Sequence, residues 1–139
     1  MKINTKIRYG MRAMIDIASS QNPEGVLQKD IAIHQDISLK YLDSIIAALK
    51  LKGLIANSRG KGSGYKLTRN PDEITVWDIY TAFEPTIIVD CIENKEFCKR
   101  SCDCKSRDYW VEFKQDLIEL LSKKSLSQII FNNNHTNLR

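Results

Sequence analysis

Arg59-Gly60-Lys61-Gly62-Ser63-Gly64-Tyr65 is the stretch that decides the fold of this chain. Its alternating glycines leave the backbone free to turn and to approach a surface closely. Arg59 and Lys61 place two cations on the turn, and Tyr65 begins an extended segment that runs to Thr68. A basic, glycine-rich hairpin tip of this kind can lie against phosphates or enter the minor groove of DNA, where the potential is most negative. A solvated β-turn is the simpler alternative, because Gly and Lys are ordinary turn residues.

Two helices joined by a tight turn precede this hairpin. The first is predicted over residues 26–34, and Gln35-Asp36 makes the turn, where Asp36 can adopt the left-handed conformation. Ser38 is expected to cap a longer helix over residues 39–52. The residues expected to face inward are Leu27, Ile31, Ala32, Leu42, Ile45, Ile46 and Leu49. The order of helix, turn, helix and basic hairpin predicts a winged helix-turn-helix, mainly α-helical with a small β-hairpin wing.

The second helix is the expected recognition helix, because such a helix reads base edges and phosphates with its N-terminal turns. Lys40, Tyr41 and Ser38 would contact phosphates and bases. Asp43 would accept a hydrogen bond from a cytosine amino group or repel wrong sequences, and Arg59 would enter the minor groove. The candidate DNA-contacting residues are Gln28, Ser38, Lys40, Tyr41, Asp43, Arg59, Lys61 and Ser63. An ordinary solvated helix face is the alternative, and the hairpin that follows favours DNA binding.

The charge distribution agrees with a head that faces a polyanion. Residues 1–70 hold twelve Lys and Arg against five Asp and Glu, whereas residues 71–139 hold nine against twelve. The basic half therefore coincides with the predicted DNA-binding half. No apolar run approaches the roughly 20 residues of a membrane span, and Met1 leads into Lys2-Ile3-Asn4 without the apolar core of a signal peptide. We expect a cytoplasmic protein with no membrane partner.

Three further helices complete the predicted chain. Apolar residues recur at helical spacing over residues 5–20, and Thr75 is expected to cap another helix that ends at Glu84-Pro85. Asp108 is expected to open the last long helix. Its apolar seam is Trp110, Phe113, Leu117, Leu120 and Leu121. A narrow seam of this kind suits a partner helix, so we expect it to pair with a second copy of the chain. Packing on its own head is the alternative.

We accordingly divide the chain into four parts. Residues 1–84 form the winged helix-turn-helix domain, and residues 85–107 form a cysteine-rich, cluster-binding loop. Residues 108–131 hold the dimerisation helix and a short closing helix that begins near Ser125, and residues 132–139 form a polar tail.

The cysteine-rich loop carries the chemistry. Its four cysteines, Cys91, Cys98, Cys102 and Cys104, are spaced C-x6-C-x3-C-x-C. Four thiolates can complete a tetrahedral metal site or hold an iron–sulfur cluster. A C-x2-C pair, common in structural zinc sites, does not occur, which weakens zinc as the ligand. Basic residues around the thiols would offset the negative charge of a thiolate-bound cluster. Reduced or disulfide-paired cysteines without a cofactor are the alternative.

Catalysis has little support in the sequence. His34 falls on a short helix and His135 in the polar tail, and neither lies near the cysteines. No Ser-His-Asp set, phosphate loop or metalloprotease helix occurs. We therefore expect no enzyme activity and no small-molecule substrate.

Taken together, these residues resemble a known family, the IscR, NsrR and CymR group of bacterial winged-helix regulators. The resemblance runs from Met1 to about Ile130. The segments that carry it are Arg8-Tyr9-Gly10-Met11-Arg12-Ala13-Met14, Ile31-Ala32, Ile37-Ser38-Leu39-Lys40-Tyr41-Leu42, the Arg59–Tyr65 wing, Ile74-Thr75-Val76-Trp77-Asp78-Ile79 and Ser125-Leu126.

The resemblance implies a homodimer that binds a palindromic operator on double-stranded DNA, with long C-terminal helices at the dimer interface. Cluster-binding members carry three cysteines before that helix, and Cys91, Cys98 and Cys104 look like those three. The fourth ligand departs from the family. IscR-like members place a His where this chain has Arg107, and nitric-oxide-sensing members use an Asp where it has Arg8. Because Arg offers no lone pair, Cys102 is the inferred substitute.

The sequence thus predicts a dimeric transcription regulator whose operator affinity depends on a cysteine-ligated iron–sulfur cluster, 2Fe–2S being favoured over 4Fe–4S. It would sense iron–sulfur or redox status. The first alternative is a cofactor-free regulator of the same family controlled by thiol oxidation or a protein partner. The second is an iron–sulfur carrier or electron-transfer protein, which would need the cluster but not the wing.

Overall fold

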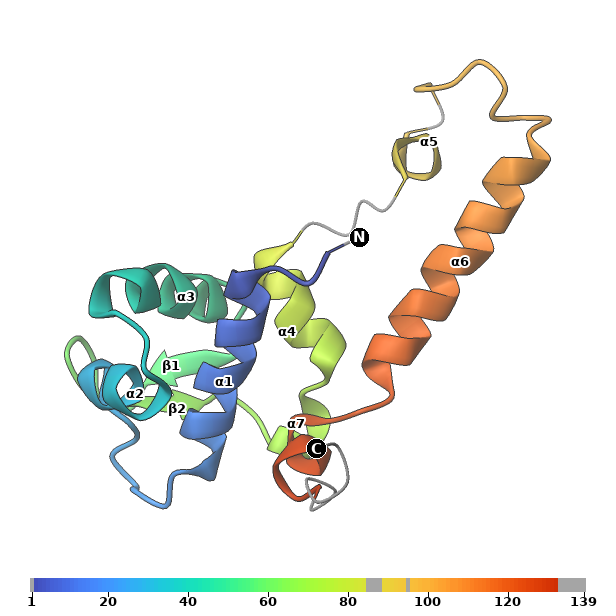
Figure 1. The fold of residues 1–139 in the computed structure, drawn as a ribbon. Helices are drawn as coiled ribbons and strands as arrows, with labels where there is room; N and C mark the ends of the chain where they lie inside the picture. Colours follow the sequence, from blue (N-terminus) through green and yellow to red (C-terminus); the bar gives the residue numbers. More distant parts are fainter. Residues whose placement is uncertain (1, 85–88, 95, 133–139) are drawn as a thin grey trace.

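The computed structural model of the chain describes residues 2–84, 89–94 and 96–132. Most of the predicted polar tail therefore lies outside the described residues. The elements, in chain order, are α1 (Thr5–Ser19), α2 (Gln28–Gln35), α3 (Leu39–Leu51), β1 (Ile55–Asn57), β2 (Tyr65–Leu67), the 3-10 turn η1 (Pro71–Glu73), α4 (Val76–Phe83), α5 (Asp90–Glu93), α6 (Lys105–Ser122) and α7 (Leu126–Ile130). Figure 1 shows α1–α4, the β1–β2 hairpin and α7 gathered into a head, from which α6 extends as an arm.

The helix-turn-helix forms as the sequence predicts. Asp36 ends α2 in the left-handed conformation at φ 52°, and the amide of Ile37 bonds the carbonyl of Ala32 at 3.0 Å. The Ser38 hydroxyl then accepts from the amide of Tyr41 and caps α3. A short acidic side chain therefore makes the turn that glycine makes elsewhere.

The start of the first helix of this pair differs from the prediction. Val26 lies in an isolated antiparallel bridge with Tyr65: its amide donates to the Tyr65 carbonyl at 3.0 Å, and its carbonyl accepts from the Tyr65 amide at 2.8 Å. The bridge holds Val26 in extended backbone, so α2 begins only at Gln28. Leu27 is consequently exposed rather than inward-facing, and Val26 occupies the buried position instead.

The core lies where α1, α3 and α4 meet. The predicted inward face of α3 is fully confirmed, since Leu42, Ile45 and Leu49 are completely buried and Ile46 nearly so. The closing segment completes this core, because Leu126 of α7 is also fully buried and its amide bonds the carbonyl of Ile74 at 2.7 Å. Helix α7 is therefore an integral part of the head.

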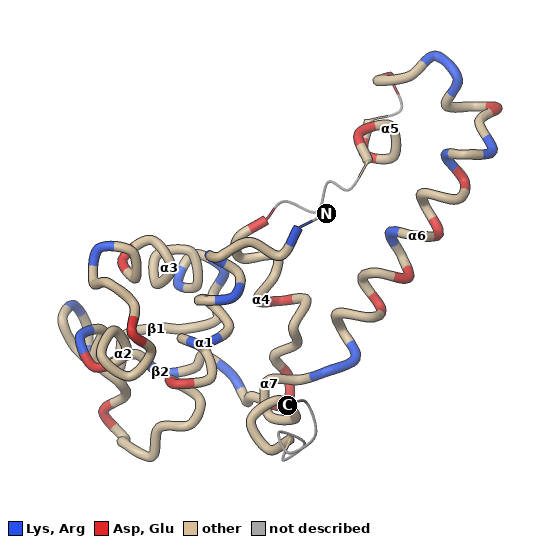
Figure 2. The backbone as a smooth tube through the Cα atoms, viewed as in Figure 1, with Lys and Arg blue, Asp and Glu red and all other residues tan. Residues whose placement is uncertain are grey.

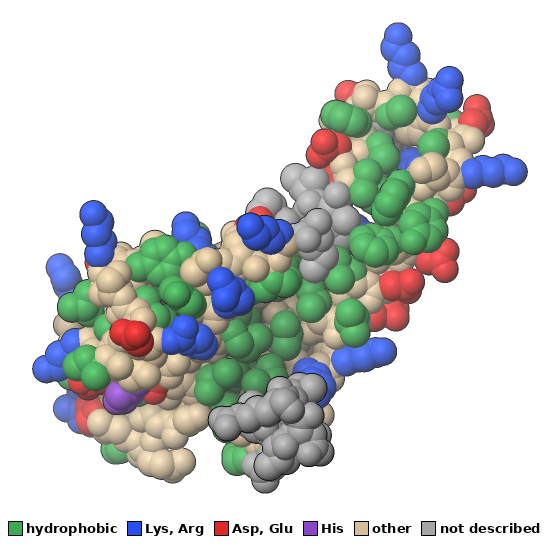
Figure 3. Space-filling view, in the orientation of Figure 1, with side chains coloured by type: hydrophobic (Ala, Val, Ile, Leu, Met, Phe, Trp, Pro, Cys, Tyr) green, Lys and Arg blue, Asp and Glu red, His purple; other side chains and the backbone are tan. Residues whose placement is uncertain are grey.

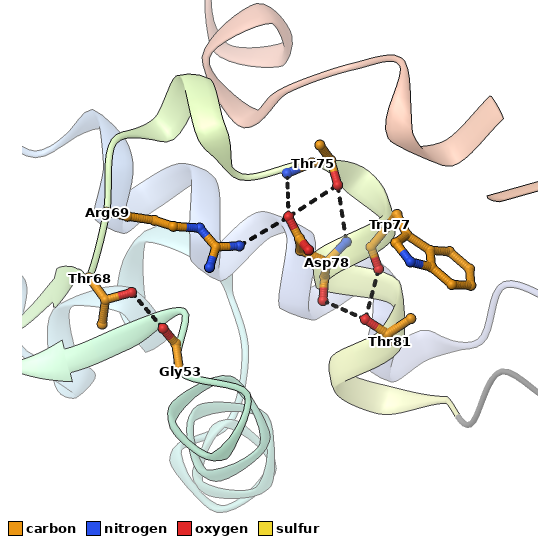
Figure 4. Close-up of polar contacts among 7 residues, drawn as sticks. All are labelled: Gly53, Thr68, Arg69, Thr75, Trp77, Asp78 and Thr81. Carbon is orange, nitrogen blue, oxygen red and sulfur yellow. Dashed lines mark hydrogen bonds and ion pairs between the residues drawn. The ribbon is translucent and has the colours of Figure 1, made fainter. Parts of the chain in front are cut away.

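A polar joint fixes the exit of the wing to α4 (Figure 4). The Asp78 carboxylate accepts from the Thr75 amide at 2.9 Å, while the Thr75 hydroxyl accepts from the Asp78 amide, so the two residues form a capping box. The same carboxylate pairs with Arg69, just after β2, at 3.1 Å. Thr75 thus caps α4 as predicted, and the joint sets the direction in which the wing leaves the head.

Helix α6 is poorly covered by the rest of the described chain. It contacts α4, yet none of its 18 residues is buried. It begins at Lys105, three residues before the predicted start at Asp108. Asp108 lies in the first turn, where the positive end of the helix dipole stabilises its carboxylate. In the part of the chain that the structure describes, no helix is long and apolar enough to span a bilayer.

Candidate nucleic-acid interface and cysteine segment

The N-terminal turns of α3 present a polar surface. Ser38, Lys40 and Asp43 are exposed, as a reading surface requires. Tyr41 was expected on the same outward face, but it is only half-exposed, because its ring packs edge-to-face against Tyr9 with centroids 5.6 Å apart. The geometry therefore keeps Tyr41 at the edge of this surface.

A hydrogen-bonded chain connects α2, α3 and the wing. Gln28 donates its side-chain amide to the carboxylate of Asp43, and Tyr65 donates its hydroxyl to the Gln28 carbonyl oxygen at 3.5 Å. Farther along α3, the Lys50 ammonium donates to the Asn57 side chain at 3.0 Å and lies 5.8 Å from the Tyr65 ring centroid. The recognition helix and the wing are therefore coupled directly, and two of the sequence-predicted residues, Gln28 and Asp43, lie together.

The wing tip owes its shape to glycine. Gly60 and Gly62 have φ values of 116° and 85°, which side-chain-bearing residues rarely adopt. A Cβ on either would meet open space, so the requirement is for backbone conformation rather than for room. Ser63 closes the tip, because its hydroxyl accepts from the Arg59 amide at 3.0 Å and donates to the Gly60 carbonyl at 2.6 Å. The structure thus gives Ser63 a role in forming the tip, and Lys61 is exposed there.

Arg59 already has an acidic partner. Its guanidinium pairs with the Glu24 carboxylate at 2.6 Å, and both side chains are largely exposed. Glu24 is held near the wing because its backbone carbonyl accepts from the Ser58 hydroxyl at 2.8 Å. Sequence reasoning missed this pairing, since the two residues lie 35 positions apart and no periodic signal joins them.

Cations dominate the reading side of the head. Figure 2 shows Lys and Arg at the wing tip and around α3, whereas residues of both charges alternate along α6. The arm itself is nearly balanced in charge, because α6 holds three Lys and Arg against four Asp and Glu, and part of the acidic back half of the sequence lies in η1 and α4 of the head. Nucleic-acid phosphates would be attracted to the cations at the wing tip and around α3.

The cysteine segment lies at the far end of the arm, next to α5 (Figure 1). All four cysteines are free thiols; Cys102 is exposed, and Cys91, Cys98 and Cys104 are half-exposed. Cys91 lies in α5, and Cys104 directly precedes α6. Within the described ranges, no three Cys, His, Asp or Glu side chains are gathered closely enough to hold a metal ion. The donor chemistry fits an iron–sulfur cluster, and binding would require the segment to close around it.

Two contacts fasten this segment to the start of the arm. The Arg107 guanidinium donates to the carbonyl of Cys91 at 3.2 Å, and the Lys114 ammonium pairs with the carboxylate of Glu93. Arg107 therefore holds the backbone of Cys91 beside the start of α6, the helix that Cys104 directly precedes. This role requires a long donor side chain, and the sequence alone did not reveal it.

The comparisons with known proteins agree with a winged helix-turn-helix regulator. The model of the family described as "Rrf2: Iron-dependent Transcriptional regulator" matches residues 3–132. The chain is 34% identical to Protein rrf2 of Nitratidesulfovibrio vulgaris over 131 residues, which cover 94% of this chain and 87% of that protein.

Solved structures give the same result. A structure of T. potens IscR superposes with a TM-score of 0.72 at 29% identity and covers all of this chain and 93% of that one. The structure of CymR, the global cysteine regulator of B. subtilis, superposes with a TM-score of 0.71 at 30% identity, with coverage of 94% and 96%. The predicted fold and the resemblance are thereby confirmed, and these relatives are regulators rather than enzymes. The chain belongs to the Rrf2 family and is a winged helix-turn-helix transcriptional regulator.

Proposed function

We propose that the chain acts as a homodimer on a palindromic operator and that its cysteine segment sets operator affinity. The observation that carries the first part is the joint placement of the α3 N-terminus and the Arg59–Lys61 wing tip on a cationic head. A recognition helix in the major groove and a cationic tip at the adjacent minor groove or phosphates form one continuous footprint. Ser38, Lys40 and Arg59 are its exposed candidate contacts.

The dimer proposal rests on the partly uncovered seam of α6. Trp110 and Leu120 are 36% and 60% exposed, and Tyr109, Trp110 and Phe113 form an aromatic cluster with neighbouring centroids 5.1 to 6.4 Å apart. Figure 3 shows hydrophobic side chains along the arm and over the adjoining surface of the head. Apolar side chains placed every three or four residues on an exposed helix favour burial against another chain.

The head offers an apolar groove at the base of the same arm. Its volume is about 490 Å³, and it lies between the first turns of α1, helix α4 and the end of α6, where Leu121 lines it with Ile7, Met11, Val76 and Tyr80. Arg8 and Arg12 also line it. An amphipathic helix such as α6 of a second copy would place its apolar seam on this floor, and its carboxylates could pair with the two cations.

For the sensor, we propose that Cys91, Cys98, Cys102 and Cys104 hold an iron–sulfur cluster, 2Fe–2S rather than 4Fe–4S. Free thiols in one short segment supply the ligand type that such clusters use. Arg107 is engaged with the Cys91 carbonyl and offers no lone pair, so Cys102 is the proposed fourth ligand. Such a site would report iron–sulfur or redox status.

A cofactor-free regulator controlled by thiol oxidation is the second candidate. It is favoured by the exposure of Cys102, two residues before Cys104, and by the likeness to CymR, whose name as a global cysteine regulator points to sulfur chemistry. A cytoplasmic location would suit either candidate.

Selection from a random-sequence DNA pool tests the DNA-binding part of the proposal. The parent protein should enrich a palindrome whose half-sites are centred about 34–36 Å apart, one helical turn of DNA. Enrichment of a single half-site, or of no sequence, would contradict the dimeric reading mode.

A further inference from the structure

One face of α1 contacts the end of α2 and the start of α3, the two helices on either side of the helix-turn-helix turn. Tyr9, Arg12 and Asp16 recur at intervals of three and four residues, so they lie on one side of α1. Before the turn, Asp16 lies 3.0 Å from the Nδ1 atom of His34 at the end of α2. After the turn, Tyr9 packs against Tyr41 in the first turns of α3. This face of α1 therefore contacts both helices of the pair.

The contact between the two tyrosines is well defined. Their ring planes lie 88° apart with centroids 5.6 Å apart, the edge-to-face arrangement that aromatic rings prefer. Tyr41 is half-buried by this packing and belongs to the shell around the core. Because a ring fixed in this way has few rotamers left, Tyr9 restricts where the Tyr41 hydroxyl can point from the N-terminal end of α3.

Arg12 holds Tyr9 in turn. Its guanidinium carbon lies 4.9 Å from the Tyr9 ring centroid, and its Nε donates to the Gln35 side chain at 3.3 Å. Gln35 also donates to Asp16 at 3.5 Å. Arg12 is thus hydrogen-bonded to Gln35, the last residue of α2, while its guanidinium covers the ring of Tyr9, which contacts α3. Both Tyr9 and Arg12 also line the apolar groove under α1.

We infer that Tyr9, held by Arg12, is a positioning residue for DNA recognition: it orients Tyr41 of the recognition helix and so raises discrimination between the operator and other DNA. This inference rests on the proposed DNA-binding function. Tyr9 itself touches no DNA in this account, and it acts only through the ring of Tyr41.

The test compares operator binding with non-specific binding. Fluorescence anisotropy would measure the Kd for the duplex that the parent selects from a random pool and for the same duplex scrambled. Tyr9→Leu keeps apolar bulk and should weaken binding to the selected duplex about threefold to tenfold, while binding to the scrambled duplex stays unchanged. Tyr9→Phe keeps the ring and should restore parent behaviour. Tyr9→Leu should add nothing in a Tyr41→Leu background, because the two side chains act as one unit.

A matched control separates positioning from general stability. Trp77→Leu removes a different aromatic pair, stacked on Tyr80 with centroids 5.8 Å apart, and should lower Tm without changing the ratio of the two affinities. An unchanged ratio in folded Tyr9→Leu, or the full effect of Tyr9→Leu persisting without Tyr41, would overturn the inference.

A measurement without DNA keeps the inference distinct from the proposed function. With fluorotyrosine incorporated, the Tyr41 fluorine resonance of the free protein should shift in Tyr9→Leu and Arg12→Ala, and an unmoved resonance would refute the positioning role. Failure of the parent to select any sequence would instead refute the proposed function.

Discussion

The guanidinium of Arg59 lies 2.6 Å from the carboxylate of Glu24, so the cation at the wing tip is paired before any DNA is present. The two side chains are 74% and 51% exposed, and an exposed pair of this kind is worth only about 0–1 kcal/mol. Phosphates can therefore compete for Arg59. If Arg59 contacts DNA as proposed, Glu24 should weaken DNA binding in two ways, since it occupies the cation and would place a negative charge beside the phosphate backbone.

This pairing makes Glu24→Gln a gain-of-affinity variant. We expect it to bind DNA about twofold to fivefold more tightly, the equivalent of up to about 1 kcal/mol, with the largest gain at low salt. Arg59→Ala should cost about 1–3 kcal/mol per half-site on the selected duplex, with little change in Tm. Glu73→Gln removes the same charge away from the wing and should leave affinity unchanged. Equal gains in both glutamine variants would show that only net charge matters.

The approach of α1 to α4 predicts a stability effect. A Cβ at Gly10 would overlap the ring of Phe83, in a helix that is buried at this point. Gly10→Ala should therefore lower the free energy of unfolding by about 1–3 kcal/mol through overpacking, measured by urea denaturation. Adding Phe83→Leu should recover part of the loss, because the smaller side chain makes room. A Gly10→Ala protein as stable as the parent would contradict the close packing.

The seam of α6 predicts the oligomeric state. Leu117→Asp places an unpaired carboxylate in the proposed interface, where its burial is costly. Light scattering should find monomers with a folded head and lost operator binding. Gln115→Asp adds the same charge at an exposed position of the same helix and should remain dimeric. A dimeric Leu117→Asp protein would place the interface elsewhere.

The identity of the fourth ligand can be read from colour. A 2Fe–2S centre has four protein ligands, so Cys102→Ala should lose the visible iron–sulfur absorbance as fully as Cys98→Ala after anaerobic reconstitution. If Cys102→Ala alone stays coloured, the fourth ligand is another group. Ser101→Ala, next to Cys102 in the chain, is the matched control and should stay coloured.

The sequence predicted what depends on local periodicity and turn chemistry. The buried face of Leu42, Ile45, Ile46 and Leu49 follows from helical spacing, and the left-handed Asp36 follows from its place between two helices. It missed features set by distant partners. Leu27 is displaced to the surface because Val26 bridges to Tyr65, almost 40 residues away.

The candidate site divides in the same way. Ser38, Lys40 and Asp43 lie exposed at the start of α3, as their positions in the recognition helix suggest. The pairing of Arg59 with Glu24, and that of Tyr41 with Tyr9, joins residues 35 and 32 positions apart. Such contacts arise only when the chain folds, so no local pattern announces them.

The most direct test of the account is operator affinity measured on one preparation with the cluster present and again after its removal. Protein reconstituted under anaerobic conditions should show visible iron–sulfur absorbance. The cluster is then removed with a chelator and an oxidant, and the thiols are reduced again. The Kd for the selected duplex should change at least tenfold on removal of the cluster, the equivalent of about 1.4 kcal/mol. The Cys98→Ala protein should show the cluster-free affinity throughout. Colourless protein, or the same affinity in both states, would contradict the claim that the cysteine segment controls DNA binding through a cluster.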